Sequence, residues 1–345
     1  MGKKNENLER FEKIVFSRVP KFITLPMENL IGKTLFELQK EIDGNFQNKY
    51  GNDITKSNFS VRSSGSVSTP GRMKTILDSN MDSVGGDLAK VYRSTQSDKL
   101  KTYLEMKGVE DFKVDIIIQE MVYGNKNKKS CSGVLLTKNP FTSNFANEFK
   151  IDDEPYIEFI PQSTGDKLMS GDVTPQTDLK SFNEKGYQKL MEQINMISKE
   201  FSYICEVEFV IEQKIGDNVE AYILQIREYK TNSSLAFVNL SGLRLETIGQ
   251  GLTVIQHSCK GIVTYDIDNL SKDKVLIADT TEWEDTKKLL NGGGLITLNG
   301  GRLSHAASIS KEFYLPCVVG ANFSEKPKEG DEIIFTGKGE ICKII

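Results

Sequence analysis

His305 is one of two histidines among the 345 residues of the chain, and it lies between a glycine pair and an amphipathic segment. Imidazole is a good nucleophile near neutral pH. Free backbone amides at the start of a helix attract an anion, and Gly300 and Gly301 let the backbone approach such a group closely. The pattern therefore favours a histidine that carries a phosphoryl group, although a lone histidine beside a turn is more often structural.

A second candidate is an arginine that a predicted strand delivers into a loop rich in serine and glycine, within residues 60–73. Arg62 has the planar fork of donors that binds two phosphate oxygens at once. The hydroxyls and free amides of the loop also suit a polyphosphate. On composition alone, a solvated serine-rich loop explains the segment equally well.

Two carboxylates and two partner side chains lie on a predicted hairpin at residues 205–227. Alternation along a strand places Glu206 and Glu208 on one face of the first strand. Gln225 and Arg227 share a face of the second strand in the same way. If the hairpin pairs these faces, oxygen ligands that suit Mg²⁺ converge with a guanidinium that neutralises phosphate. The alternative is a cross-strand salt-bridge face.

Between these motifs, an apolar strand at residues 114–122 ends in a polar step formed by Gln119 and Glu120 and continues to Val122. Such a strand can wall an adenine pocket and offer backbone hydrogen bonds to the edge of the base. By itself the pattern is typical of a core sheet.

The composition is that of a soluble globular protein with about two domains, because 38% of the residues are hydrophobic and 27% are charged. The net charge of −4 argues against a general nucleic-acid binder. The five cysteines are never paired as CxxC, and no signal peptide or membrane-spanning run is evident, so we expect free thiols in the cytoplasm. Two histidines and scattered cysteines make a zinc site an unfavoured explanation.

The elements that position these residues fall into two predicted units. The first is predicted to contain helices at residues 82–103 and 187–201 and strands at residues 114–122, 132–136, 156–160, 205–212 and 220–227. The second is predicted to contain strands at residues 261–265, 275–278 and 294–297, helices at residues 284–290 and 306–313, and a hairpin near residues 332–344. Because strands alternate with helices there, we expect an α/β unit built on a central sheet.

Taken in order, the motifs resemble those of enzymes that use or make phosphoenolpyruvate through a phosphohistidine. These are pyruvate phosphate dikinase, phosphoenolpyruvate synthase and the related rifampicin phosphotransferase. The similar segments are the phosphate-binding and adenine-hinge segments of an ATP-grasp domain at residues 60–71 and 119–125, further segments of that domain at 133–140 and 165–175, and a phosphohistidine signature at 300–320. The resemblance covers residues 55–345.

The resemblance implies a fold of class α/β (α+β). It places an ATP-grasp domain with a shortened N-terminal part at residues 1–229, a linker at 230–249 and a swivelling phosphohistidine domain at 250–345. It also implies a cytoplasmic ATP-dependent phosphotransferase with His305 and Arg62 as catalytic residues. His305 would take the β-phosphoryl group of ATP and release AMP. The implied ATP-binding residues are Arg62, Gln119, Glu120, Val122, Glu208, Gln225 and Arg227, and Glu208 and Gln225 would bind Mg²⁺.

Several positions depart from the family pattern. Leu303 stands where the family usually has threonine, Lys311 replaces an arginine, and Lys138 replaces the arginine of Thr-Arg-Asn-Pro. The Gly-Gly-Lys-Gly segment that supplies a phosphate-binding lysine is not clearly present, and Lys33 is a poor candidate for it.

We also find no barrel that would bind pyruvate. We therefore expect a separate protein to carry the acceptor domain, and we expect neither nucleic acid nor a membrane as a partner. A degenerate nucleotide-binding or regulatory module without turnover is the alternative function. A complete antibiotic phosphotransferase is disfavoured, because no third domain is available to form its pocket.

Overall fold

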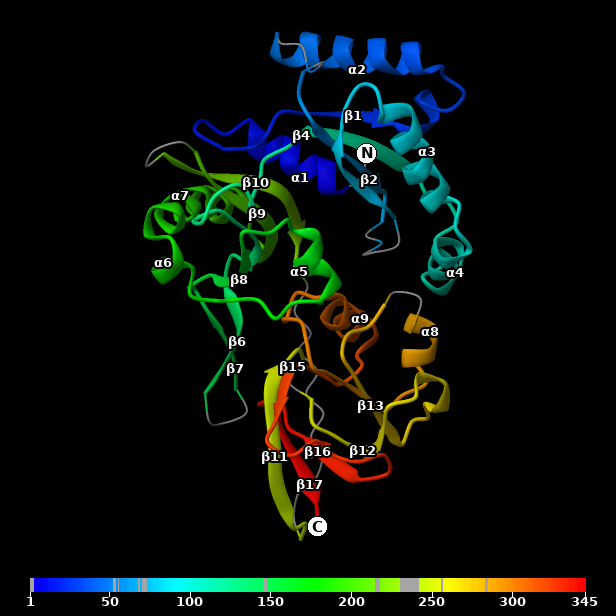
Figure 1. Ribbon diagram of the computed structural model, residues 1–345, viewed down its shortest axis with the longest axis vertical. Helices are drawn as coiled ribbons and strands as arrows, with labels where there is room; N and C mark the ends of the chain where they lie inside the picture. Colours follow the sequence, from blue (N-terminus) through cyan, green and yellow to red (C-terminus); the bar gives the residue numbers. More distant parts are fainter. Residues whose placement is uncertain are drawn as a thin grey trace.

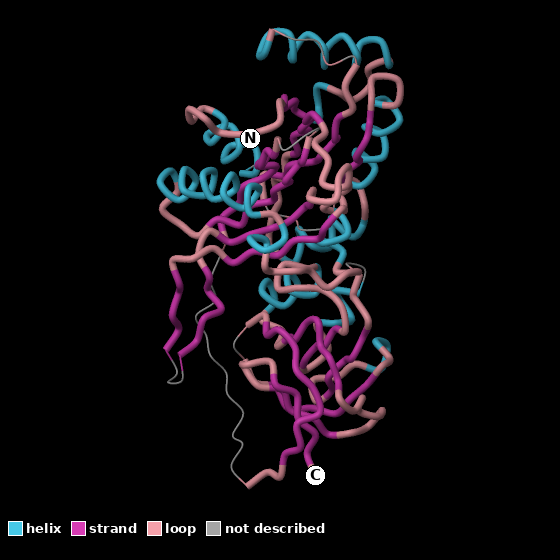
Figure 2. The backbone as a smooth tube through the Cα atoms, turned by 60° about the vertical axis from the view of Figure 1, so that its left-hand side comes forward, coloured by secondary structure: helices cyan, strands magenta, loops and turns pink. Residues whose placement is uncertain are grey.

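The computed structural model describes the chain except for residues 1–2, 52–53, 55, 68, 70–72, 145–147, 215–217, 230–241, 256 and 283–284. Two antiparallel sheets and a closed barrel form the framework, and both views place the barrel at one end of the molecule (Figure 1 and Figure 2). Helix α9 (His305–Phe313) lies where the barrel meets the rest of the chain (Figure 1). Within the described ranges, no helix is both long and apolar enough to cross a membrane.

The first sheet has the strand order β1-β4-β2-β3. Its strands are β1 (Phe22–Pro26), β2 (Phe59–Gly65), β3 (Thr75–Ser79) and β4 (Val114–Glu120). Helices α2 (Leu35–Tyr50) and α3 (Val84–Thr95) share one apolar core with this sheet. Helix α2 begins with a capping box between Thr34 and Glu37, and its C-terminus is capped by Gly51, whose left-handed conformation suits glycine. The 3₁₀ helix η1 (Met27–Asn29) and helix α4 (Asp98–Met106) complete this lobe.

The second sheet has the order β10-β9-β5-β8. Its strands are β5 (Cys131–Leu136), β8 (Tyr156–Pro161), β9 (Cys205–Gln213) and β10 (Val219–Glu228). Helix α7 (Glu184–Glu200) buries Leu190, Ile194 and Ile197 in the core of this sheet because their spacing puts them on one helix face. The remaining elements are α1 (Lys3–Glu12), α5 (Asp166–Ser170), α6 (Leu179–Phe182) and the hairpin of β6 (Asn139–Asn144) and β7 (Glu148–Asp152).

The C-terminal unit is a closed barrel rather than a simple central sheet, with the order β11-β15-β14-β13-β12-β16-β17. Its strands are β11 (Leu245–Thr253), β12 (Cys259–Thr264), β13 (Lys274–Ala278), β14 (Gly294–Thr297), β15 (Cys317–Phe323), β16 (Glu332–Phe335) and β17 (Glu340–Ile344). Closure follows because the bulged strand β11 pairs with β15 and also with β17. Strands β12 to β15 are parallel, as alternation with η2 (Ile267–Asn269), α8 (Thr286–Leu289) and α9 predicts.

Two features of the first lobe differ from the sequence-based expectation. The single helix expected at residues 82–103 is two helices, α3 and α4, because the side chain of Ser97 caps a new start by accepting from the amide of Leu100. Strand β3 was not predicted. Parts of four other expectations lie outside the described residues: most of the linker at 230–249, the hairpin turn at 215–217, positions 68 and 70–72 of the serine-rich loop, and residue 284 of the helix expected at 284–290.

Candidate active site

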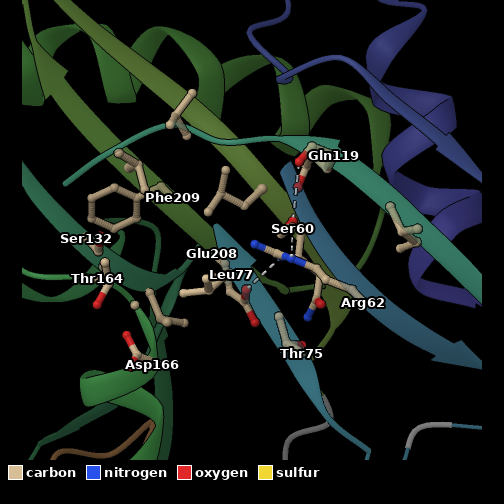
Figure 3. A pocket seen from close by; sticks show the side chains of 18 of the residues that line it. Ser60, Arg62, Thr75, Leu77, Gln119, Ser132, Thr164, Asp166, Glu208 and Phe209 are labelled. Atoms are coloured by element: carbon tan, nitrogen blue, oxygen red, sulfur yellow. Dashed lines mark hydrogen bonds and ion pairs between the residues drawn. The ribbon is translucent and has the colours of Figure 1, made fainter. Parts of the chain in front are cut away.

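A cavity of about 350 Å³ opens between the two sheets and the start of α9. Eight of the side chains singled out in the sequence line it: Arg62, Gln119, Glu120, Val122, Glu208, Gln225, Arg227 and His305; Glu206 is not among the lining residues. They come from β2, the end of β4, β9, β10 and α9, so groups far apart in sequence meet at one place. Figure 3 labels Arg62, Gln119 and Glu208 among them. The structure therefore brings these side chains together, and their roles in binding and catalysis stay predictions.

Arg62 enters the cavity from β2, where it pairs with Ile117 of β4. Its Nε donates to Oγ of Ser60 at 3.2 Å, and Nη1 lies 3.5 Å from Oε2 of Glu208 on the other sheet (Figure 3). Burial lowers the pKa of Arg62, and the nearby Glu208 opposes that effect. The guanidinium stays charged, so an anion in this cavity would be attracted to it.

The hairpin predicted at residues 205–227 is confirmed by the pairing of β9 with β10. An irregularity between Ile223 and Gln225 sets Gln225 opposite Glu208 and Arg227 opposite Glu206. Nε of Arg227 donates to Oε1 of Glu206 at 2.7 Å, and its Nη2 contacts the same oxygen. Burial alone would lower the pKa of Arg227, but Glu206 and Glu208 together raise it.

The same strand pair offers a limited set of metal ligands. Among the described residues, no group of three or more His, Cys, Asp or Glu side chains could hold a metal ion by itself. Glu208 and Gln225 present a carboxylate and an amide as cross-strand neighbours on the cavity wall. This donor set fits a Mg²⁺ ion that takes its remaining oxygen ligands from a nucleotide and water.

The end of β4 forms another wall of the cavity. Gln119 is 1% exposed, and its Nε2 has no hydrogen-bond partner among the described residues. A buried donor without an acceptor is costly, so this amide is suited to an acceptor on a ligand. Phe209, Ser132 and Thr164 lie across the cavity from Arg62 (Figure 3).

His305 reaches the cavity from the barrel side at the first residue of α9. The preceding Ser304 caps the helix by accepting from the amide of Ala307, which confirms the predicted helix start. Gly300 has φ of +95°, a left-handed conformation that favours glycine.

Two charged side chains near this site were not proposed from the sequence: Glu158, which is buried, and Lys311, which is half-buried. Glu158 of β8 accepts backbone hydrogen bonds from Arg302 at 2.7 Å and Leu303 at 3.2 Å, and burial raises its pKa against those hydrogen bonds. Lys311 of α9 donates to the carbonyl of Arg302 at 3.4 Å, and burial lowers its pKa while Glu206 opposes the shift. A single glutamate within the apolar strand at residues 156–160 was the signal available in the sequence.

Comparisons with known protein families match both units. Residues 21–178 match the family model "Pyruvate phosphate dikinase, AMP/ATP-binding domain". Residues 270–339 match "PEP-utilising enzyme, mobile domain". The two matches occur in the order in which the resemblance placed the two domains.

Individual relatives agree at low identity. A pyruvate, phosphate dikinase of Rickettsia typhi is 25% identical over 295 residues, which is 72% of this chain and 32% of that protein. The enzyme of Clostridium symbiosum is 24% identical over 319 residues, covering 76% of this chain and 35% of its own. The chain thus spans about a third of the length of these relatives. A solved N5-carboxyaminoimidazole synthase from Aspergillus clavatus aligns with 67% of this chain and 45% of its own at 13% identity, with a TM-score of 0.35, too distant a likeness to carry an argument.

The matched ranges include the strands that carry Arg62 and Gln119 and the helix that begins at His305. The order of the two domains, the curated relatives and the motifs quoted from the sequence agree with one another. Residues 21–178 and 270–339 are thus similar to the nucleotide-binding and mobile domains of the pyruvate phosphate dikinase family of PEP-utilising enzymes.

Proposed function

We propose that this chain transfers the β-phosphoryl group of ATP to His305 and releases AMP. One observation carries the proposal: side chains from three parts of the fold line the same cavity. His305 comes from the barrel side, and Arg62 and Glu208 come from the two sheets. A phosphoryl donor bound there would lie between a basic side chain and a histidine nucleophile. This arrangement is what transfer to a histidine requires.

The reaction balances as a displacement at the β-phosphorus. A ring nitrogen of His305 forms the new N–P bond, and the bond from that phosphorus to the oxygen bridging it to the α-phosphorus breaks, so AMP leaves with the electron pair. Water or inorganic phosphate then attacks the γ-phosphorus, and the bond from that phosphorus to the oxygen bridging it to the β-phosphorus breaks, so the β-phosphoryl group stays on His305. Arg62 neutralises the charge that the phosphate chain carries. Arg227 adds positive charge from within its pair with Glu206.

The other wall residues bind and orient the nucleotide in this proposal. Gln119, Glu120 and Val122 lie at the base end, where the buried amide of Gln119 offers a donor. Glu208 and Gln225 would hold Mg²⁺, which when bound neutralises phosphate charge. The phosphorylated barrel then moves on the linker to an acceptor of the pyruvate type held by a separate partner.

A phosphorylation experiment tests the first step. The protein is incubated with ATP labelled at the β-position, and intact protein and nucleotides are analysed by mass spectrometry. We expect acid-labile label on His305 and equimolar AMP, and neither in a His305→Ala variant. Full-rate AMP formation by that variant would overturn the histidine mechanism.

The alternative is a nucleotide-binding or regulatory module without turnover, and one observation favours it. Lys33, the poor candidate for the family's phosphate-binding lysine, pairs with Glu41 of helix α2, and the described residues that line the cavity include no lysine. ATP binding measured by calorimetry, combined with an unmodified His305 after prolonged incubation, would support this alternative.

A further inference from the structure

The carboxylate of Glu158 is completely buried on β8 and has a polar environment that belongs mostly to the other unit. Oε1 accepts from the amide of Arg302 at 2.7 Å and from the hydroxyl of Tyr156 at 2.7 Å. Oε2 accepts from the amide of Leu303 at 3.2 Å. A buried carboxylate without such donors would be strongly disfavoured, so the two amides of the barrel loop stabilise it when the units are in contact.

Leu303 completes this contact with its side chain. It is 1% exposed, although it belongs to the loop that precedes α9. Its apolar cluster consists otherwise of residues from the sheet unit: Val134, Leu136, Tyr156, Ile160 and Leu168. If the barrel moved away, this leucine would lose its apolar surroundings and enter water, which is unfavourable.

The backbone shape of the loop is adapted to the carboxylate. A Cβ atom at Gly301 would lie 2.4 Å from Oε2 and 2.6 Å from Oε1 of Glu158. Real side chains do not approach so closely, so only glycine permits the carboxylate to reach the next two amides. A second contact lies nearby, where Oγ1 of Thr280 donates to the carbonyl of Ser170 at 3.3 Å.

We propose that Glu158 and Leu303 form a docking lock that positions His305 at the cavity. Glu158 holds the backbone of residues 302 and 303, and Leu303 fills an apolar socket on the sheet unit. Both contacts end two residues before His305, so they determine where the first turn of α9 lies relative to Arg62 and Glu208. Glu158 is a positioning residue that acts through the loop. The catalytic part of the proposal rests on the proposed function, whereas the lock itself does not.

The lock is tested by amide hydrogen exchange on the full chain without ligand. Glu158→Gln keeps the size of the side chain but presents an NH₂ group where one acceptor is needed. We expect exchange at the amides of residues 302 and 303 to accelerate about ten- to a hundredfold, the loss expected for a hydrogen bond to a charged acceptor. Glu154→Gln removes an exposed carboxylate just before the same strand and should leave these amides unchanged.

Two further variants approach the lock from the barrel side. Gly301→Ala inserts the clashing Cβ, and Leu303→Thr empties the apolar socket, so both should accelerate exchange at the same amides. Because Glu158 and Gly301 act at one contact, the double variant should exchange no faster than the faster single variant. Wild-type exchange rates in folded Glu158→Gln and Gly301→Ala would overturn the lock.

Single-turnover kinetics separate positioning from general damage. With β-labelled ATP, Glu158→Gln should phosphorylate His305 about ten- to a hundredfold more slowly at saturating nucleotide, while its Kd for ATP stays that of the wild type. An equal loss in Kd with an unchanged saturating rate would contradict the positioning role. If the wild type itself forms no phosphohistidine, the proposed function fails, yet the exchange experiment still decides whether the lock exists.

Discussion

Strand β9 carries two glutamates two residues apart, and each forms a pair with an arginine. The pairs differ in how completely the glutamate offsets the positive charge of its arginine. Glu206 and Arg227 belong to one hairpin, with Nε 2.7 Å from Oε1, and their side chains are 7% and 17% exposed. Glu208 lies 3.5 Å from Arg62 of the other sheet, and those side chains are 23% and 13% exposed. The first pair is closed within a hairpin, and the second spans the cavity between two sheets.

The pKa of the two arginines moves in opposite directions for a physical reason. Burial lowers the pKa of Arg62, and Glu208 does not fully offset it. Burial acts on Arg227 in the same sense, yet Glu206 and Glu208 together raise its pKa. Arg227 therefore already has enough negative charge around it, whereas Arg62 is a buried cation that a bound polyphosphate would stabilise. We therefore propose that the first pair is structural and that the second binds ligand.

Removal of Glu206 should have the largest effect, and it should lower the free energy of unfolding. Glu206→Ala leaves Arg227 without its carboxylate and takes away the negative charge that favours protonated Lys311. Breaking a buried pair by deleting one partner costs about 3–5 kcal/mol. Urea unfolding followed by circular dichroism should show this loss. The matched variant Glu208→Ala should lose clearly less, and equal losses would contradict the distinction between the pairs.

Removal of Arg62 should have the second-largest effect, and it should lower the rate of His305 phosphorylation. Loss of a preorganised positive group at the developing charge costs about 10²–10³ in rate. We expect rapid-quench measurements of His305 phosphorylation to show such a drop for Arg62→Ala, with Arg62→Lys in between because it keeps the charge but not the fork. Arg93→Ala removes an exposed arginine of α3 and serves as control. A fall in the phosphorylation rate of less than about tenfold for Arg62→Ala would mean that Arg62, like Arg227, has a structural role.

The sequence predicted which side chains share a face of the hairpin because that signal is local, whereas the contact of Glu208 with Arg62 of the other sheet was not predicted. Alternation along residues 205–212 and 220–227 determines which side chains share a face, and a turn between them makes pairing a short-range event. Similarly, a glycine pair followed by Ser304 and His305 predicts a helix start without knowledge of the rest of the fold. These local signals do not bring the two sheets and α9 together; only the family resemblance placed these side chains in one nucleotide site, and their roles there stay predictions.

The contacts between the units could not be predicted in the same way. The hydrogen bonds of Glu158 join residues separated by 144 and 145 positions, and nothing near residue 158 indicates what lies opposite. Closure of the barrel depends likewise on β11 pairing with two strands, which is a matter of bulges and register rather than of apolar pattern. Long-range packing decides both features.

The smallest predicted effect concerns Lys311, whose half-buried side chain is kept protonated in part by the negative charge of Glu206. Burial lowers its pKa in the folded protein below the usual 10.5. The unfolded chain therefore binds this proton more tightly, so stability should increase as pH rises from the folded value towards 10.5.

Measured by urea unfolding between pH 7 and pH 10, wild type should gain stability relative to Lys311→Met, which cannot titrate. The exposed Lys287 provides the matched control, because Lys287→Met should track wild type across the same range. If the difference in unfolding free energy between wild type and Lys311→Met did not change with pH, the negative charge of Glu206 would offset the effect of burial on Lys311 as completely as it does for Arg227. Glu206 would then stabilise two cations, Arg227 on β10 and Lys311 on α9.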